Sequence, residues 1–177
     1  MDIIKLNKFY KPKIIFKNKI FSCQLGANGI FPNFKKIEGD FSTPKGKWKL
    51  GKIFYRKDKL PFIKIKKFQR KNTFYITKKC GWCDDLRSNN YNKYIKLNEK
   101  KSINVKYEEM HRCDDAYDIV IEIKYNKNPT IKGKGSAIFI HCSFMDKRST
   151  KGCVAISKKE LIYILKKLEK GTIFKIM

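Results

Sequence analysis

Cys153 and His141 are the residues of this 177-residue chain whose types best suit nucleophilic chemistry. A cysteine attacks as its thiolate, so it needs a base or a cationic environment nearby. The sequence has two histidines, and His141 follows the apolar run 138–140, which predicts a buried strand able to hold an imidazole rigidly. Gly152 would let a substrate carbonyl approach the backbone, whose amides near Cys153 could bind an oxyanion. These residue types are compatible with cysteine-dependent acyl transfer.

The same residues also have an ordinary structural interpretation. A Gly-Cys pair before the apolar residues 154–156 is most often a buried cysteine entering a strand or helix, and a histidine at a strand end is often hydrogen-bonded framework. The cations Lys147, Arg148 and Lys151 favour the chemical interpretation, because they are expected to lower the thiol pKa. Residue types and spacing alone leave both interpretations open.

The chain is strongly basic, with 42 Lys and Arg against 16 Asp and Glu and a formal net charge of +26. Such a charge attracts polyanions, including nucleic acid, anionic lipid and an anionic cell wall. The lysines are scattered along the whole chain, however, and the abundance of Lys, Ile, Asn and Phe favours compositional drift over one selected patch. We expect no specific nucleic-acid partner, and a non-catalytic polyanion-binding domain is the alternative of a different class.

The alternating lysines and apolar residues of 62–68 could bind single-stranded nucleic acid through charge and stacking. The same period of two predicts an ordinary strand with lysines outward, which we favour. No stretch approaches the ~18 apolar residues of a membrane span. The segment 1–8 is broken by charges and lacks the apolar core of a secretory signal, so we expect no export signal there.

The six cysteines are too few and too irregularly spaced for a disulfide scaffold in a domain of this size. Cys80, Cys83, His111 and Cys113 are acceptable ligand types for structural zinc. The second pair is separated by a single residue, a poor fit to familiar zinc spacings. We therefore favour unlinked thiols in a loop and a strand over structural zinc at these positions.

The elements that position these residues are predicted to be mostly strands. Strand-like runs are 13–16, 19–23, 50–55, 74–77, 117–123 and 135–141, whereas the polar, Asn-rich stretch 80–94 predicts a long loop. One helix is predicted after the N-cap Ser157, with Glu160 completing a capping box and Gly171 at the stop. Its apolar face comprises Leu161, Ile164, Leu165 and Leu168. The prediction is a single, mainly β domain over residues 1–177 with a C-terminal α-helix.

The residues around Cys153 belong to a longer series of motifs. His141 is followed, after seven residues, by Ser149-Thr150-Lys151-Gly152-Cys153-Val154, and Thr43-Pro44-x-Gly46-x-Trp48 lies upstream. The series resembles the YkuD-type L,D-transpeptidases, whose pattern is His, then Ser/Thr-His-Gly-Cys and an apolar residue, with an upstream Thr-Pro-x-Gly-x-aromatic element. A compact subgroup is similar at Glu38-Gly39-Asp40, Gly81-Trp82-Cys83-Asp84-Asp85, Tyr91-Asn92, Tyr117-Asp118, Tyr125-Asn126 and Gly135-Ser136-Ala137-Ile138-Phe139. The resemblance runs from about Gly26 to the C-terminal helix.

The resemblance implies that Cys153 attacks a stem-peptide carbonyl of peptidoglycan and forms a thioester. His141 would take the thiol proton and later activate the acceptor amine. The backbone at Gly152 and Cys153 would form the oxyanion hole, and the carbonyl of Cys142 would orient the imidazole. An amine acceptor gives a cross-link and makes the protein a transpeptidase, whereas water gives an L,D-carboxypeptidase or endopeptidase. The resemblance implies neither a metal nor an organic cofactor. The implied fold is a sandwich-like arrangement of mixed β-sheets.

A second group of residues is expected to bind substrate. Acidic side chains could hold the free amine of the acceptor, and an arginine could hold a stem carboxylate. The expected binding residues are Trp82, Asp84, Asp85, Arg87, Tyr91, Thr150 and Lys151. The alternative for the acidic pair is a loop whose Asp side chains bond their own backbone.

The sequence also departs from the family pattern. Lys151 stands where the family has histidine, the loop from His141 to Cys153 is short, and residues 154–156 lack the polar residue often found after the cysteine. These departures concern substrate binding more than the identity of the nucleophile. Some members of the similar compact subgroup join stems at the first residue, L-alanine, and not at the usual third residue, so the resemblance leaves the donor position open. The implied location is the periplasm or cell envelope, and we expect a monomer.

Overall fold

The computed structural model of the chain describes residues 3–7, 12–61, 63–97, 104–144, 146 and 148–177. The chain is mainly β with mixed sheets, as predicted. The strands are β1 Ile3–Asn7, β2 Lys13–Phe16, β3 Lys19–Ser22, β4 Ile30–Phe31, β5 Thr43–Pro44, β6 Gly46–Tyr55, β7 Thr73–Tyr75, β8 Cys80–Cys83, β9 Lys93–Lys96, β10 Tyr107–Glu109, β11 Ile119–Ile123, β12 Phe139–Cys142, β13 Val154–Ile156 and β14 Ile173–Ile176. The helices are the 3-10 turns η1 Asn33–Lys35 and η2 Asp115–Tyr117, and the α-helices α1 Lys67–Arg70 and α2 Lys158–Lys167.

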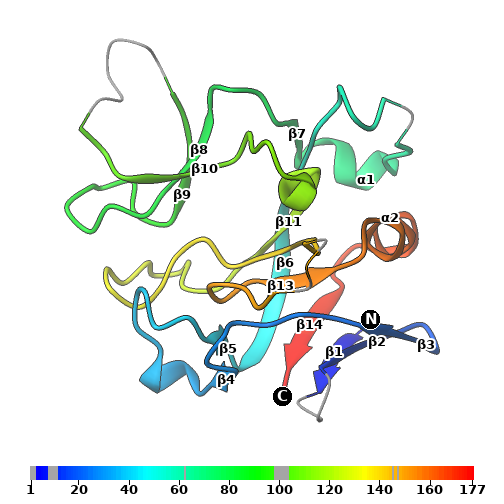
Figure 1. Cartoon of the computed structure of the whole chain (residues 1–177), viewed down its shortest axis with the longest axis horizontal. Coiled ribbons are helices and arrows are strands. Elements are labelled where there is room, and N and C mark those ends of the chain that lie inside the picture. Colours follow the sequence, from blue (N-terminus) through cyan, green and yellow to red (C-terminus); the bar gives the residue numbers. More distant parts are fainter. Residues whose placement is uncertain (1–2, 8–11, 62, 98–103, 145, 147) are drawn as a thin grey trace.

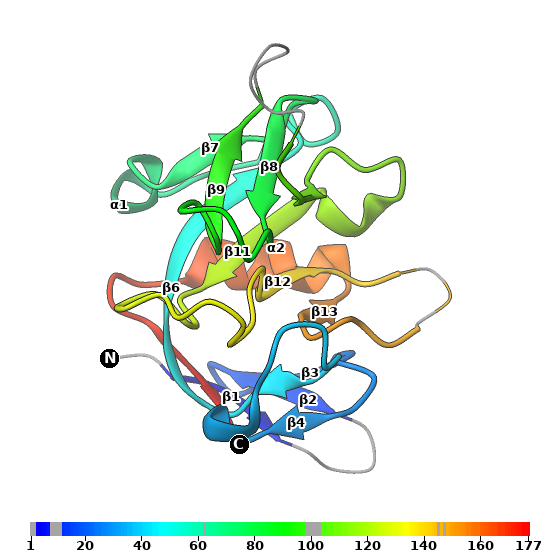
Figure 2. The same ribbon diagram turned by 90° about the vertical axis from the view of Figure 1, so that its left-hand side faces the viewer.

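The largest sheet has the strand order β13-β12-β11-β6-β14-β1-β2-β3, with β7 also paired to β6. A second sheet has the order β10-β8-β9, and β4 pairs with β5. Figure 1 shows the β10-β8-β9 sheet at the opposite end of the molecule from β1–β5, and Figure 2 shows the same separation from the side. The small sheet therefore stands over one end of the large one.

The central strand β11 is buried along its whole length because both faces of the large sheet are covered. Since side chains alternate along a strand, Ile119, Ile121 and Ile123 enter the first core cluster, which also contains the buried face of α2. Val120 points to the other face and enters a second core cluster with Trp82 of the small sheet. The sheet is thus packed against α2 on one side and against the 80–117 region on the other.

The C-terminal helix is built as its sequence predicts. Ser157 accepts a hydrogen bond from Glu160 N, and the Glu160 side chain accepts from Ser157 N, so the capping box is present. Leu161, Ile164 and Leu165 are completely buried. The predicted helix start and apolar face are confirmed, while the helix ends before Gly171, which lies in the turn to β14.

The prediction of a loop over 80–94 is wrong at both ends, because β8 and β9 pair there antiparallel, with Trp82 opposite Tyr94. All four residues of β8 are buried, so the run has no polar–apolar alternation that could reveal a strand. Strand pairing outweighs the local polar composition here.

Two predicted strands begin later than expected. The 117–123 strand starts at Ile119, because the Asp114 side chain accepts from Ala116 N and caps η2. The 135–141 strand starts at Phe139, because Gly135 and Ala137 have positive φ angles of 99° and 51°, which extended strands do not allow. His141 is accordingly the third residue of β12.

The predicted strand over 62–68 is also wrong within the described residues, where α1 begins at Lys67. Gln69 Nε2 donates to Leu165 O at 3.1 Å, so this segment is tied to α2 and has no strand partner. Ile63 and Ile65 still pack on the first core cluster. The alternation of apolar residues and lysines in this segment therefore reflects the partial burial of Ile63 and Ile65, and it does not indicate a strand.

Candidate active site

Strand pairing brings Cys153 and His141 to the same face of the large sheet. β12 and β13 run parallel, with Ile140 opposite Val154 and His141 opposite Ala155. Ile140 and Val154 belong to the first core cluster, so their alternating neighbours point to the other face. Phe139 and Cys153 both lie in the second core cluster, and Tyr117 of that cluster packs edge-on against His141.

The Cys153 thiol is held by backbone groups. Its Sγ–H donates to Ala137 O at 3.1 Å, and Phe139 N donates to Sγ at 3.4 Å. The residue is 8% exposed, and burial raises the thiol pKa to about 12. At neutral pH the resting side chain is therefore a neutral thiol and needs a base before it can attack.

His141 has the orientation that a general base requires. Its Nδ1 lies 2.8 Å from Cys142 O, and because a carbonyl can only accept, the tautomer protonated at Nδ1 satisfies this contact and leaves Nε2 unprotonated. The ring centroid lies 5.3 Å from that of Tyr117 and 5.8 Å from that of Phe144. Burial lowers the imidazole pKa to about 4, so the ring is neutral at pH 7.

The expectation that nearby cations lower the thiol pKa is wrong. Lys147 lies outside the described residues, Lys151 is exposed, and the Arg148 guanidinium sits 4.1 Å from the centre of the Phe144 ring. The charges of Lys36 and Arg112 favour the thiolate, but desolvation outweighs them and Glu108 opposes them. In the resting protein Cys153 is thus a neutral thiol and His141 a neutral imidazole, and the two do not form a thiolate–imidazolium ion pair.

This protonation state predicts slow alkylation. We expect iodoacetamide to modify Cys153 more slowly at pH 7.5 than the exposed Cys113, with a rate that rises about tenfold per pH unit because the thiolate fraction does so below a pKa of about 12. Peptide mapping of both cysteines over a pH series measures the two rates. A fast rate at Cys153 that does not change between pH 6 and 9 would contradict the assignment of a neutral thiol.

The turn that carries Cys153 is braced by Thr150. Thr150 Oγ1 donates to Cys153 O at 2.6 Å and accepts from Gly152 N at 3.1 Å. Gly152 has a φ of 132°, and a Cβ there would come within 2.8 Å of Ser42 O. Glycine is required at this position both for the backbone angle and for the close approach of residue 42. Thr150 is 5% exposed and holds the turn.

Charged and aromatic side chains lie around His141, and most of them were not predicted as site residues from the sequence. Tyr117 Oη donates to Glu108 Oε1 at 3.0 Å. Arg112 lies 5.1 Å from the Tyr117 ring centre and makes two hydrogen bonds, 2.8 and 2.6 Å, to Asp114. Only Tyr117 carried a sequence signal, because it belongs to a motif, whereas Arg112 and Glu108 have no local pattern.

The predicted binding residues Trp82 and Tyr91 are almost fully buried. Trp82 Nε1 donates to Asn92 Oδ1 at 3.0 Å, and its ring packs edge-on against Phe139. Tyr91 Oη donates to Glu38 Oε2 at 2.5 Å and accepts from Gly135 N at 3.1 Å. Both side chains support the walls around the second core cluster.

The adjacent carboxylates Asp84 and Asp85 differ in their surroundings. Asp85 accepts from Arg87 N, the Arg87 side chain and Lys106 N, which hold its pKa well below the usual range. Asp84 Oδ1 is buried and has no hydrogen-bond partner among the described residues. Desolvation raises the Asp84 pKa, Lys106 opposes this, and the carboxylates of Glu38 and Glu108 add to it. Asp85 ties down its own loop, while Asp84 keeps an unused acceptor.

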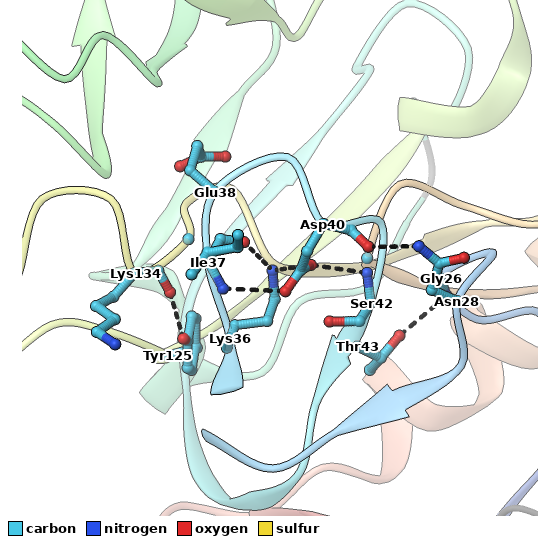
Figure 3. Close-up of polar contacts among 12 residues, drawn as sticks. Gly26, Asn28, Lys36, Ile37, Glu38, Asp40, Ser42, Thr43, Tyr125 and Lys134 are labelled. Atoms are coloured by element: carbon cyan, nitrogen blue, oxygen red, sulfur yellow. Dashed lines mark hydrogen bonds and ion pairs between the residues drawn. The ribbon is translucent and has the colours of Figure 1, made fainter. Parts of the chain in front are cut away.

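The 36–42 loop is fixed by a buried ion pair (Figure 3). Lys36 Nζ lies 2.7 Å from Asp40 Oδ1 and donates to Ile37 O at 3.1 Å. Asp40 also accepts from the backbone N–H groups of Ile37 and Ser42. With Gly26 N donating to Thr43 Oγ1, the loop is held beside the turn that carries Cys153.

Comparison with known proteins assigns the domain. The family description "L,D-transpeptidase catalytic domain" (YkuD) matches residues 11–176. The chain belongs to this family. A comparison with curated proteins gave no match.

Two solved structures are similar to the L,D-transpeptidase domain. They are crystal structures of the helical cell shape determining protein Pgp2 from Campylobacter jejuni and of a single-substitution mutant of it, each 17% identical, with TM-scores of 0.47 and 0.45. Each alignment covers 99% of this chain and 46% of the other, so the chain spans about half the length of those proteins. Among the described residues, no helix is both long and apolar enough to cross a membrane.

The residues considered for zinc do not assemble. Within the described parts of the L,D-transpeptidase domain, no three His, Cys, Asp or Glu side chains are placed to hold a metal ion. Cys80 Sγ lies 3.3 Å from Tyr94 Oη and accepts from Thr77 N, and Cys113 is exposed. In the described residues, these four side chains are therefore not brought together as a group of metal ligands.

Asn92 is a structural residue of the site that composition alone did not identify. Its Oδ1 accepts from Trp82 Nε1 and Ala137 N, and its Nδ2 donates to Tyr125 O and Asn126 O, at 2.8 to 3.2 Å. Ala137 in turn accepts from the Cys153 thiol. One amide side chain thus connects the small sheet to the backbone that positions the Cys153 thiol.

Replacing Asn92 by aspartate is expected to destabilise the domain by about 3 kcal/mol, because a buried carboxylate would face the two carbonyls that now accept from Nδ2. Urea unfolding measures the loss, and turnover at a temperature where the variant is folded should also fall. Asn90→Asp on the same exposed loop is the matched control and should change neither quantity. Equal stability of the two variants would contradict the four-bond assignment.

Proposed function

We propose that the chain is a cysteine-dependent peptidoglycan L,D-transpeptidase, with Cys153 as nucleophile and His141 as general base. The observation that carries the proposal is geometric. Both side chains project from neighbouring strands to one face of the sheet, with the thiol hydrogen-bonded to backbone and the imidazole oriented by Cys142 O. Membership of the L,D-transpeptidase family supports stem peptides as the substrate and the cell envelope as the place of action.

The reaction follows from the resting protonation states. His141 Nε2 takes the Sγ proton as Sγ bonds to the carbonyl carbon of the donor stem, giving a tetrahedral oxyanion and an imidazolium. The imidazolium returns the proton to the leaving amine as the C–N bond breaks, which leaves a Cys153 thioester. The acceptor amine then attacks the thioester, His141 takes its proton, and the thiol is released with a new amide bond. Water in place of the amine gives a hydrolysed stem.

The oxyanion donor from this turn is the backbone amide of Cys153. Gly152 N already donates to Thr150 Oγ1, so it would have to leave that partner before it could bind substrate. The space beside the Gly152 Cα is filled by Ser42 O, so this glycine is required by the fold of the turn and not by the approach of the substrate carbonyl. Thr150 is therefore proposed to shape the oxyanion site, and the exposed Lys151 to meet the substrate at its edge.

We propose Asp84 as the group that holds the acceptor amine. Its Oδ1 is buried and unpartnered among the described residues, and Glu38 and Glu108 add negative charge around it. Lys106 Nζ lies 3.9 Å from the other oxygen, Oδ2, so an ammonium group at Oδ1 would supply the missing hydrogen bond. Asp85 and Arg87 bind each other, so their proposed part is to hold the loop that carries Asp84.

Replacing Asp84 by asparagine should raise the KM for the acceptor amine about tenfold, since a charge-assisted hydrogen bond contributes roughly 1.5–3 kcal/mol. Hydrolysis of the donor should be retained, because water needs no ammonium site. Acceptor titrations with separate quantification of cross-linked and hydrolysed products measure both. The exposed Asp146→Asn is the control, and an unchanged acceptor KM in the Asp84 variant would remove Asp84 from the site.

The proposal is tested by incubating the protein with purified sacculi and analysing the muropeptides by mass spectrometry. Cross-linked dimers that require Cys153 support a transpeptidase, and shortened stems without dimers indicate a hydrolase on the same site. The mass of each product also identifies the donor position, first or third stem residue. Unchanged muropeptides with folded protein would overturn the proposal.

A further inference from the structure

Two cavities lie along β6 and share wall residues. One, of about 470 Å³, lies between β6 and the turn after β11, and the other, of about 520 Å³, lies between β6 and the turn before β14. Lys49 and Lys124 line both, so the two cavities are adjacent along β6, and together we call them the track. Figure 2 shows these segments together beside β6. Neither cavity is lined by Cys153 or His141, so the track is distinct from the acyl-transfer site.

The walls of the track are basic. We call the six lysines Lys47, Lys49, Lys71, Lys124, Lys134 and Lys170 the lysine track; all six line one or both cavities. No ion pair among the described residues involves any of the six. The one acidic residue among the described residues of the two walls is Glu169, whose carboxylate pairs with Lys17 at 2.5 Å. The chain therefore offers these cations little internal compensation.

Like charges also meet across the strands beside the track. In the antiparallel pair of β6 and β14, Lys47 lies directly opposite Lys175, so the two side chains share one face of the sheet. Like charges in this position destabilise a sheet, and a bound anion would relieve the repulsion. The neighbouring Lys127 is already paired with Glu122. Burial lowers the pKa of Lys127, and the positive charges of Lys52 and Lys124 lower it further.

Apolar side chains flank the same walls. Phe34 is 75% exposed and Ile131 is 53% exposed, and both line the first cavity with Trp48. Exposed apolar side chains at the edge of a charged groove commonly mark an interaction site. Cations with an apolar border suit a polymer that carries carboxylates on peptide branches beside apolar groups better than they suit a small inorganic anion.

We propose that the lysine track binds the stem-peptide carboxylates of a glycan strand and holds the strand on the enzyme during turnover. The assignment of a glycan strand as the bound polymer rests on the proposed function. The six lysines are spread over two adjacent cavities, and this arrangement suits several carboxylates along one strand. The six lysines of the track come from distant parts of the sequence, and the fold brings them together along β6.

The test compares binding to purified sacculi in a Cys153→Ala background, so that no turnover occurs. The variant Lys47→Gln/Lys49→Gln/Lys124→Gln should bind roughly tenfold more weakly, from three exposed charge contacts. The control Lys78→Gln/Lys159→Gln/Lys166→Gln removes the same charge from exposed lysines outside both cavities and should change binding less than twofold. Amidating the sacculus carboxylates should remove the difference between the two triple variants.

Equal weakening by the two triple variants would overturn the lysine track, because net charge alone would then explain binding. If amidated sacculi still bind as tightly as untreated ones and the track variant still weakens that binding, the glycan is not the occupant. The same conclusion follows if the track binds a single-stranded oligonucleotide more tightly than it binds sacculi. With active Cys153 present, the track variant should still turn over soluble muropeptides. If soluble muropeptides are not turned over but sacculus binding depends on the track, the proposed function fails and this inference stands.

Discussion

Replacing Cys153 by alanine is expected to abolish muropeptide turnover, with a loss of about 10⁴-fold or more, since removal of a nucleophile leaves only binding and oxyanion stabilisation. The fold should survive. The thiol makes two weak hydrogen bonds, to Ala137 O and from Phe139 N, and alanine fits the same space. Muropeptide analysis gives the rate, and circular dichroism with thermal unfolding reports the fold.

The matched control for this variant is Cys113→Ala, which removes an exposed thiol and should leave the rate unchanged. Cys142→Ala is a further comparison, since that thiol is buried in the first core cluster and only its carbonyl is proposed to act. Cys142→Ala should cost stability and retain turnover. Wild-type turnover by folded Cys153→Ala would exclude Cys153 as the nucleophile.

Replacing His141 is expected to be nearly as damaging, about 10²- to 10⁴-fold, because general-base catalysis contributes on that scale. The effect should be near the upper end here. The thiol pKa of about 12 leaves almost no thiolate at neutral pH, and the position that is histidine in the family pattern is Lys151 in this chain. His141→Gln is preferable to His141→Ala, since glutamine fills the space beside Tyr117 and can still bond to Cys142 O.

The pH dependence provides a second readout for His141. Its folded pKa of about 4 lies below the ordinary 6.5, so the imidazole stays neutral and competent as pH falls to about 5. Activity should be lost only as pH falls through about 4, whereas an unshifted histidine would lose it near 6.5. An acid limb near 6.5, or activity in His141→Gln close to that of the wild type, would contradict the role of His141 as the base.

Elements whose residue pattern has a single structural solution could be predicted from the sequence. The capping box at Ser157 and Glu160 and the 3.6-residue spacing of Leu161, Ile164 and Leu165 predict α2 correctly, since both depend on local chemistry. The apolar runs that became β2 and β11 were found for the same reason. The mainly β fold of the family was also expected from the motif order and is confirmed.

The small sheet and the walls of the site could not be predicted because they depend on contacts between distant residues. β8 is buried on both sides, so its Cys-Gly-Trp-Cys run shows no periodicity. Asn92 bonds to residues 33 to 45 positions away, and no local pattern reports such partners. The thiol pKa is a similar case, because nearby cations in the sequence suggested a lowered value and burial in the fold raises it.

The thioester on Cys153 is the central claim, and mass spectrometry of the acyl-enzyme tests it most directly. Wild-type protein is mixed with a donor muropeptide, quenched in acid within the first turnovers, digested and mapped. The account predicts that the peptide containing Cys153 gains the mass of the donor acyl group, and that hydroxylamine removes it. The adduct should be absent in Cys153→Ala and strongly reduced in His141→Gln. Turnover without any adduct on Cys153, or an adduct on another residue, would contradict the account.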